Sequence, residues 1–225
     1  MSFLASLRPL LAMAYPATPL RMTAEEYLAF DAAAPPGEKY EFYDGWVVPR
    51  HGYDETGTVA MAGASPEHND IGINVAATFH ALARKQGCRA GAGDQRVRSF
   101  GRAYVYPDFV LACGEPVYSD DTPPVLETPS LVLEITSTST VAVDRGQKLT
   151  SYTQLDSLQE YWILDQEVAE VTRFARTGNS WRIENAVGLD ATMRCDVLGV
   201  EIALADLYAG VDVDDQPPYA PGSPS

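Results

Sequence analysis

The sequence has few basic residues, few cysteines and no long apolar run. Its 225 residues contain 16 Lys and Arg against 31 Asp and Glu, which gives a formal net charge of −15. No apolar run approaches the roughly 20 residues of a membrane-spanning helix, so we expect no membrane partner. The acidic excess opposes bulk electrostatic binding of nucleic acid, because proteins that bind this way are usually basic on one face. If DNA is a partner, its binding should be weak or depend on a metal ion.

The cysteines Cys88, Cys113 and Cys195 are odd in number and far apart in the sequence. This spacing argues against a disulfide framework and is typical of a reducing, cytoplasmic location. No Cys-x-x-Cys pair or Cys/His cluster is present, so the sequence does not indicate a zinc site.

The length and composition predict one globular domain with a sizeable core. We expect a mildly apolar N-terminal arm over residues 1–21 and the folded domain over residues 22–211. Residues 212–225 are acidic and then rich in Pro, Gly and Ser, so we expect a disordered tail there.

Local signals predict the main elements of an α/β or α+β domain. Thr23 and Glu26 form a capping box, Asp44-Gly45 marks a hairpin turn, and Ser65-Pro66 begins a long helix. A mixed central sheet flanked by helices follows from the remaining pattern. Its predicted strands are residues 89–100, 105–113, 131–136, 161–164, 168–175 and 181–184, and its later helices are residues 141–155 and 202–208.

Two carboxylates stand in apolar surroundings where a carboxylate is costly. Asp108 follows Pro107 at the head of one apolar run, and Glu134 is the single charge within another. Neighbouring strands would bring the two acids together as an oxygen-rich site suited to Mg²⁺ or Mn²⁺. Lys148 follows on a predicted helix, where its ammonium could orient a water or neutralise charge on a phosphate.

Several ordered stretches of the chain resemble the Uma2 family of endonucleases, which belongs to the PD-(D/E)XK superfamily. No single stretch is diagnostic, but their ordered occurrence between residues 22 and 208 is specific. The stretches are Met22-Thr23-Ala24-Glu25-Glu26-Tyr27-Leu28, Tyr40-Glu41-Phe42-Tyr43-Asp44-Gly45, Ser65-Pro66-Glu67-His68, Pro107-Asp108, Leu133-Glu134-Ile135-Thr136-Ser137, Asp144 through Lys148 to Tyr152, Glu160-Tyr161-Trp162-Ile163-Leu164-Asp165 and Leu198-Gly199-Val200-Glu201-Ile202.

The resemblance implies a restriction-endonuclease-like fold in which Asp108 and Glu134 ligate a divalent cation. It also implies that Glu41 is an auxiliary acid. The superfamily lysine commonly lies two residues after the second acid, where this chain has Thr136. In the Uma2 pattern the lysine lies on the following helix, and Lys148 matches that position.

Each candidate residue also has a structural interpretation. Asp108 could be a turn residue, Glu134 part of a buried ion pair, and Lys148 a solvated helix residue. Glu41 could face solvent. Three further residues are candidate phosphate contacts that could equally be structural or exposed polar residues: His68, Arg96 and Arg98.

The sequence therefore predicts a metal-dependent endonuclease that hydrolyses DNA, expected to act as a homodimer because nucleases that cut both strands commonly pair. Fold does not determine function, so two alternatives remain open. One is a catalytically inactive interaction module on the same fold. The other is a metal-dependent hydrolase of a smaller phosphate substrate.

Overall fold

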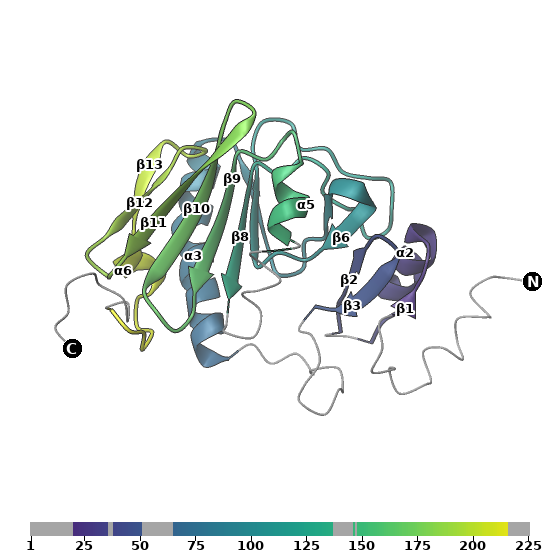
Figure 1. The fold of residues 1–225 in the computed structure, drawn as a ribbon, viewed down its shortest axis with the longest axis horizontal. Coiled ribbons are helices and arrows are strands. Elements are labelled where there is room, and N and C mark those ends of the chain that lie inside the picture. Colours follow the sequence, from purple (N-terminus) through teal and green to yellow (C-terminus); the bar gives the residue numbers. More distant parts are fainter. Residues whose placement is uncertain (1–19, 36–37, 51–64, 137–145, 147, 216–225) are drawn as a thin grey trace, which may run out of the picture.

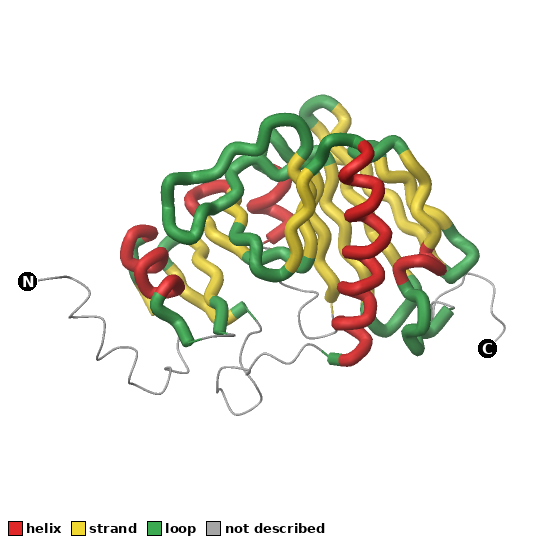
Figure 2. Tube along the Cα trace, turned by 180° about the vertical axis from the view of Figure 1, so that it is seen from behind, coloured by secondary structure: helices red, strands yellow, loops and turns green. Residues whose placement is uncertain are grey.

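The computed structural model of the protein describes residues 20–35, 38–50, 65–136, 146 and 148–215. It has a mixed α+β architecture with a six-stranded sheet, a five-stranded sheet and a two-stranded hairpin (Figures 1 and 2). The helices are α2 (Ala24–Ala32), α3 (Pro66–Lys85), α5 (Leu149–Thr153) and α6 (Leu204–Leu207), with a 3₁₀ turn at Phe100–Arg102. The strands are β1 (Leu20–Arg21), β2 (Tyr40–Tyr43), β3 (Trp46–Pro49), β4 (Arg89–Ala92), β5 (Val97–Ser99), β6 (Ala103–Val105), β7 (Phe109–Ala112), β8 (Leu131–Thr136), β9 (Glu160–Asp165), β10 (Glu170–Thr177), β11 (Ser180–Val187), β12 (Thr192–Cys195) and β13 (Val200–Ala203).

Local sequence signals determine where the first elements begin and turn. The capping box predicted at Thr23 and Glu26 begins α2, and the Ser65 side chain accepts a hydrogen bond from the His68 amide at the start of α3. Asp44 and Gly45 have positive φ values of 46° and 90°, as a two-residue hairpin turn between β2 and β3 requires. These predictions are confirmed.

The six-stranded sheet has the order β11-β10-β9-β8-β7-β4. Strands β8 and β9 run parallel, and the other neighbouring pairs run antiparallel. Phe109 of β7 pairs with Leu133 of β8, so this register places Asp108, one residue before β7, beside Glu134.

Two predicted strands are divided between the sheets. The region 89–100 forms β4 in the six-stranded sheet and β5 in the five-stranded sheet, with Gly93 at a φ of 50° between them. The region 105–113 is interrupted at Tyr106-Pro107-Asp108, because proline has no N–H to donate to a strand ladder. The chain therefore passes from one sheet to the other immediately before Asp108.

Helices and the second sheet cover the two faces of the six-stranded sheet. Helix α3 lies across one face, where Ile71, Val75 and Phe79 join a core that includes Leu133 and Ile135 (Figure 2). The β12–β13 hairpin and α6 complete that core. On the other face, α5 and the five-stranded sheet pack against residues that include Val110, Val132 and Ile163 (Figure 1).

The ends of the described chain are held by strand-like contacts. β1, at the end of the predicted arm, pairs with β3, whereas residues 1–19 lie outside the described residues. Asp214, which composition places in the tail, exchanges backbone hydrogen bonds with Glu167 and Ala169. Residues 216–225 are also outside the described part. Among the described helices, none has the length and apolarity needed to cross a bilayer.

A disulfide joins Cys88 and Cys113, which corrects the expectation of reduced thiols. The register pairs Arg89 with Ala112, so the two cysteines stand opposite each other where β4 begins and β7 ends. Strand register determines which cysteines meet, and their separation of 25 residues in the sequence concealed the pair. Cys195 is a buried free thiol.

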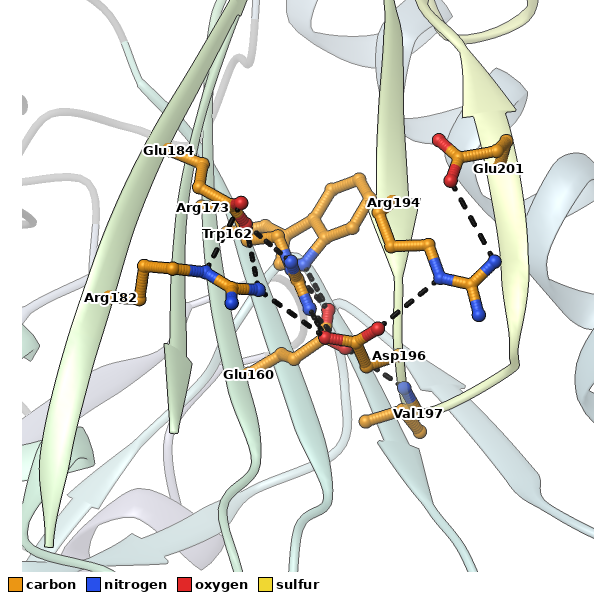
Figure 3. Close-up of polar contacts among 9 residues, drawn as sticks. All are labelled: Glu160, Trp162, Arg173, Arg182, Glu184, Arg194, Asp196, Val197 and Glu201. Carbon is orange, nitrogen blue, oxygen red and sulfur yellow. Dashed lines mark hydrogen bonds and ion pairs between the residues drawn. The ribbon is translucent and has the colours of Figure 1, made fainter. Parts of the chain in front are cut away.

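A buried arginine attaches the β12–β13 hairpin to the six-stranded sheet (Figure 3). Arg173 of β10 is fully buried and forms two hydrogen bonds of 3.1 Å with the Glu160 carboxylate on β9. It also pairs with Glu184 of β11 and with Asp196 in the hairpin turn. The Val197 amide donates to Glu160 at 2.9 Å, so backbone and side chain contacts converge on one carboxylate.

Replacing Arg173 should destabilise the protein far more than replacing a neighbouring surface arginine. Arg173→Met leaves the buried Glu160 without its cation, which costs about 3–5 kcal/mol of unfolding free energy. Arg194→Gln removes a half-exposed partner of Asp196 and should cost at most about 1 kcal/mol. Urea unfolding followed by circular dichroism measures both. Equal losses would show that the Arg173 cluster does not hold the hairpin.

Candidate active site

The site predicted from the sequence lies where the two sheets meet. The chain leaves β6 at Val105, turns through Tyr106 and Pro107, and enters β7 after Asp108. The Tyr106 amide donates a 3.0 Å hydrogen bond to Glu41 of β2, which fixes the crossover to the five-stranded sheet. Candidate site residues from β2, β8 and the start of α5 therefore gather around a single turn.

Lys148 lies between two acids that come from different sheets. Its Nζ is 3.2 Å from Oε1 of Glu134 on β8 and 3.5 Å from Oε1 of Glu41 on β2. The three side chains are at most 8% exposed, where a charged group needs a partner, and the ion pairs provide one. Leu133 and Ile135 belong to the core beneath α3, while Glu134 faces the opposite side, as strand alternation predicts.

Hydroxyl groups hold both carboxylates in place. Tyr43 donates to Glu41 at 2.7 Å, and Tyr152 of α5 donates to Glu134 at 3.2 Å. Burial, together with the nearby Glu134 and Glu41 charges, raises the pKa of Tyr152 well above its ordinary value. The Tyr152 hydroxyl therefore keeps its proton and acts as a donor.

Asp108 has a separate set of partners. Its Oδ1 lies 2.7 Å from a guanidinium nitrogen of Arg50 and 3.2 Å from Nε2 of His68, and its Oδ2 accepts from the Ile135 amide at 2.8 Å. Burial acts to raise the Asp108 pKa. The His68 hydrogen bond, the Arg50 charge and the Ile135 amide outweigh burial and lower the pKa to about 2. Asp108 is therefore ionised at neutral pH.

The site has a deep part and a more exposed part. Glu41 and Glu134 are each 3% exposed and Lys148 is 8% exposed. Asp108 and Arg50 are 12% and 11% exposed, and the His68 side chain, at the start of α3, reaches 21%. A substrate that approaches from solvent would meet the Asp108 side first.

Arg96 and Arg98 lie outside this group. Arg96 is buried, pairs with Asp31 and donates to the Tyr106 hydroxyl, so it offers no surface to a phosphate. Arg98 is 37% exposed and pairs with Asp121 and Glu127. Of the three candidate phosphate contacts, the structure brings only His68 beside the acids.

The carboxylate oxygens at this site are of the type that hard divalent cations prefer as ligands. Asp108 and Glu134 provide such oxygens at adjacent strand positions. Glu41 lies close to them, because Lys148 pairs with both Glu41 and Glu134. Within the described ranges, no three His, Cys, Asp or Glu side chains form a group that could hold a metal. Each of the two carboxylates forms an ion pair with a basic side chain, Asp108 with Arg50 and Glu134 with Lys148.

Sequence reasoning missed Arg50. It directly follows the β3 strand of the predicted hairpin, which pairs with the Glu41 strand, so its position near the site was open to inference. Its contact with Asp108 joins residues 58 positions apart, and no local pattern indicates such a pair. Asp144, the other helix residue of the resemblance, lies outside the described residues.

Comparison with known proteins identifies similar chains. Two curated relatives come from Synechocystis sp.. "Uncharacterized protein sll1609" is 29% identical over 177 residues, covering 78% of this chain and 93% of the relative. "Uncharacterized protein slr1290" is 26% identical over 193 residues, covering 85% and 93%. Both alignments span most of each protein.

A solved structure shares the fold. It is described as a "putative nuclease belonging to DUF820" from Anabaena variabilis, with a TM-score of 0.63 and 14% identity. The match covers 84% of this chain and 98% of the other, which confirms the restriction-endonuclease-like fold expected from the sequence. The Uma2 profile, described as "Putative restriction endonuclease", matches residues 24–205, from α2 into α6. Because this match covers most of the chain, the protein belongs to the Uma2 family.

Proposed function

We propose that this protein is a metal-dependent endonuclease that hydrolyses DNA phosphodiester bonds. The observation that carries the proposal is the grouping of Glu41, Glu134 and Lys148 beside Asp108 at the junction of the two sheets. Membership of the Uma2 family supports a nuclease over other phosphate-directed hydrolases.

In this proposal Asp108 and Glu134 hold a Mg²⁺ or Mn²⁺ ion, and Glu41 is the auxiliary acid. Bound there, such an ion supplies Lewis-acid chemistry, lowering the pKa of a water and polarising the scissile phosphate. Lys148 orients the water or stabilises charge that develops on the phosphate, because two carboxylates fix its ammonium beside the site. Tyr43 and Tyr152 keep those carboxylates aligned.

Purified protein is expected to nick or cut plasmid DNA in Mn²⁺ or Mg²⁺, and EDTA should abolish cleavage. Asp108→Asn and Glu134→Gln should each lower the rate by about a hundredfold or more, because each removes a carboxylate assigned to the ion. Gel assays measure the rates, and Glu201→Gln, at an exposed acid of β13, is the control.

Two results would contradict the nuclease proposal. Intact DNA with every metal, and no calorimetric Mn²⁺ binding that Asp108→Asn removes, would favour an inactive interaction module. Hydrolysis of a small phosphodiester but not of DNA would favour the hydrolase of a smaller substrate.

Lys148→Met should separate the structural role of the ammonium from its proposed catalytic role. In EDTA the variant should lose about 3–5 kcal/mol of unfolding free energy, since two buried carboxylates lose their cation. Saturating Mn²⁺ should restore stability by binding the folded state, while DNA cleavage stays low. Urea unfolding and cleavage assays test this, with the exposed Lys85→Met as control. Equal stability of both variants in EDTA would contradict it.

A homodimer is expected, because nucleases that cut both strands of a duplex commonly pair. Within the described sheets, β11 is an edge strand of the six-stranded sheet and pairs with β10 alone. Light scattering at micromolar concentration should give twice the 24.4 kDa chain mass. A monomer across that range, with and without Mn²⁺, would contradict the assembly.

A further inference from the structure

Arg50 reaches the Asp108 carboxylate from the end of β3. One guanidinium nitrogen lies 2.7 Å from Oδ1 of Asp108, and the other donates to the Gly93 carbonyl at 3.0 Å. The Arg50 side chain is 11% exposed. Arginine stays protonated in proteins, so this contact places a permanent positive charge on a carboxylate that the proposed function assigns to a metal ion.

A divalent ion and the Arg50 guanidinium are competitors for Asp108. Both are cations, and at contact distance in a largely buried site their repulsion is weakly screened. An ion bound by Asp108 and Glu134 would therefore take the carboxylate partner from Arg50. A buried guanidinium left with a carbonyl alone is costly, so it requires another anion.

We propose that Arg50 alternates between two anions, Asp108 before an ion binds and a DNA backbone phosphate afterwards. The inference rests on the proposed function and deepens it by naming a substrate-binding residue. The planar guanidinium matches phosphate geometry with two parallel hydrogen bonds. Arg50 also lies in the more exposed part of the site beside His68, whereas Lys148 lies deeper.

The first test measures metal binding alone. Mn²⁺ is titrated calorimetrically into wild type and Arg50→Gln. The variant should bind Mn²⁺ about tenfold more tightly, because the ion then displaces no cation from Asp108 and meets no like charge beside it. Arg50→Lys retains the charge and should stay closer to wild type. Arg194→Gln removes a surface arginine from a carboxylate pair and should leave Mn²⁺ affinity unchanged. Circular dichroism verifies that each variant is folded.

The second test measures binding of a short fluorescent DNA duplex by anisotropy. The duplex carries hydrolysis-resistant phosphorothioate linkages, because Mn²⁺ is expected to support cleavage of ordinary DNA, and gels verify that it stays intact. In Mn²⁺, Arg50→Gln should bind the duplex more weakly than wild type. The slope of log affinity against log salt should become shallower by about 0.9, the value for one lost phosphate contact. In EDTA the two proteins should bind alike, because Asp108 then holds Arg50. If Arg50 were purely structural, its replacement would not strengthen metal binding while weakening DNA binding.

The outcomes separate this inference from the nuclease proposal. Equal Mn²⁺ affinities, or equal DNA affinities in Mn²⁺, would overturn the role of Arg50 even where DNA is cleaved. Both shifts without any cleavage would support the role of Arg50 and overturn the nuclease proposal. Failure of both proteins to bind Mn²⁺ would overturn both.

Discussion

The ion triad of Glu41, Lys148 and Glu134 is the interaction on which the site depends. Glu41 comes from the five-stranded sheet, Glu134 from the six-stranded sheet, and Lys148 from the start of α5. Each side chain is nearly buried, and ionised groups in such surroundings persist only when they are paired. The triad therefore joins the two sheets and the start of α5 at this junction.

The crossover before β7 places Asp108 next to the triad. Pro107 ends strand pairing, and the Tyr106 amide is bound by Glu41, so the chain enters β7 at a fixed register. The Tyr106 hydroxyl in turn contacts the buried Asp31–Arg96 pair. Arg96 thus contacts Tyr106 within the crossover. It is buried there, whereas the predicted phosphate contact needs an accessible guanidinium.

Local chemistry made much of this structure predictable. The Asp44-Gly45 turn, the caps at Thr23 and Ser65, and the alternation around Glu134 each depend on neighbours within a few residues. The division of residues 89–100 between two sheets, the β12–β13 hairpin and the Cys88–Cys113 disulfide depend on long-range register. The Arg50–Asp108 pair is of the same kind, because it forms only once two sheets are placed against each other.

Charge balance at the site would reconcile an acidic protein with the proposed DNA substrate. Among the described residues, three carboxylates and two protein cations meet at the site. They are Asp108, Glu41 and Glu134 with Arg50 and Lys148, and with His68 counted as neutral they leave one formal negative charge. A divalent ion would turn that charge to one positive and free the Arg50 guanidinium for phosphate. The net charge of −15 is spread over the whole chain, and salt screens charges beyond about 8 Å. Under the proposed function, the local sign would therefore dominate for a bound phosphate, and DNA affinity would depend on metal binding.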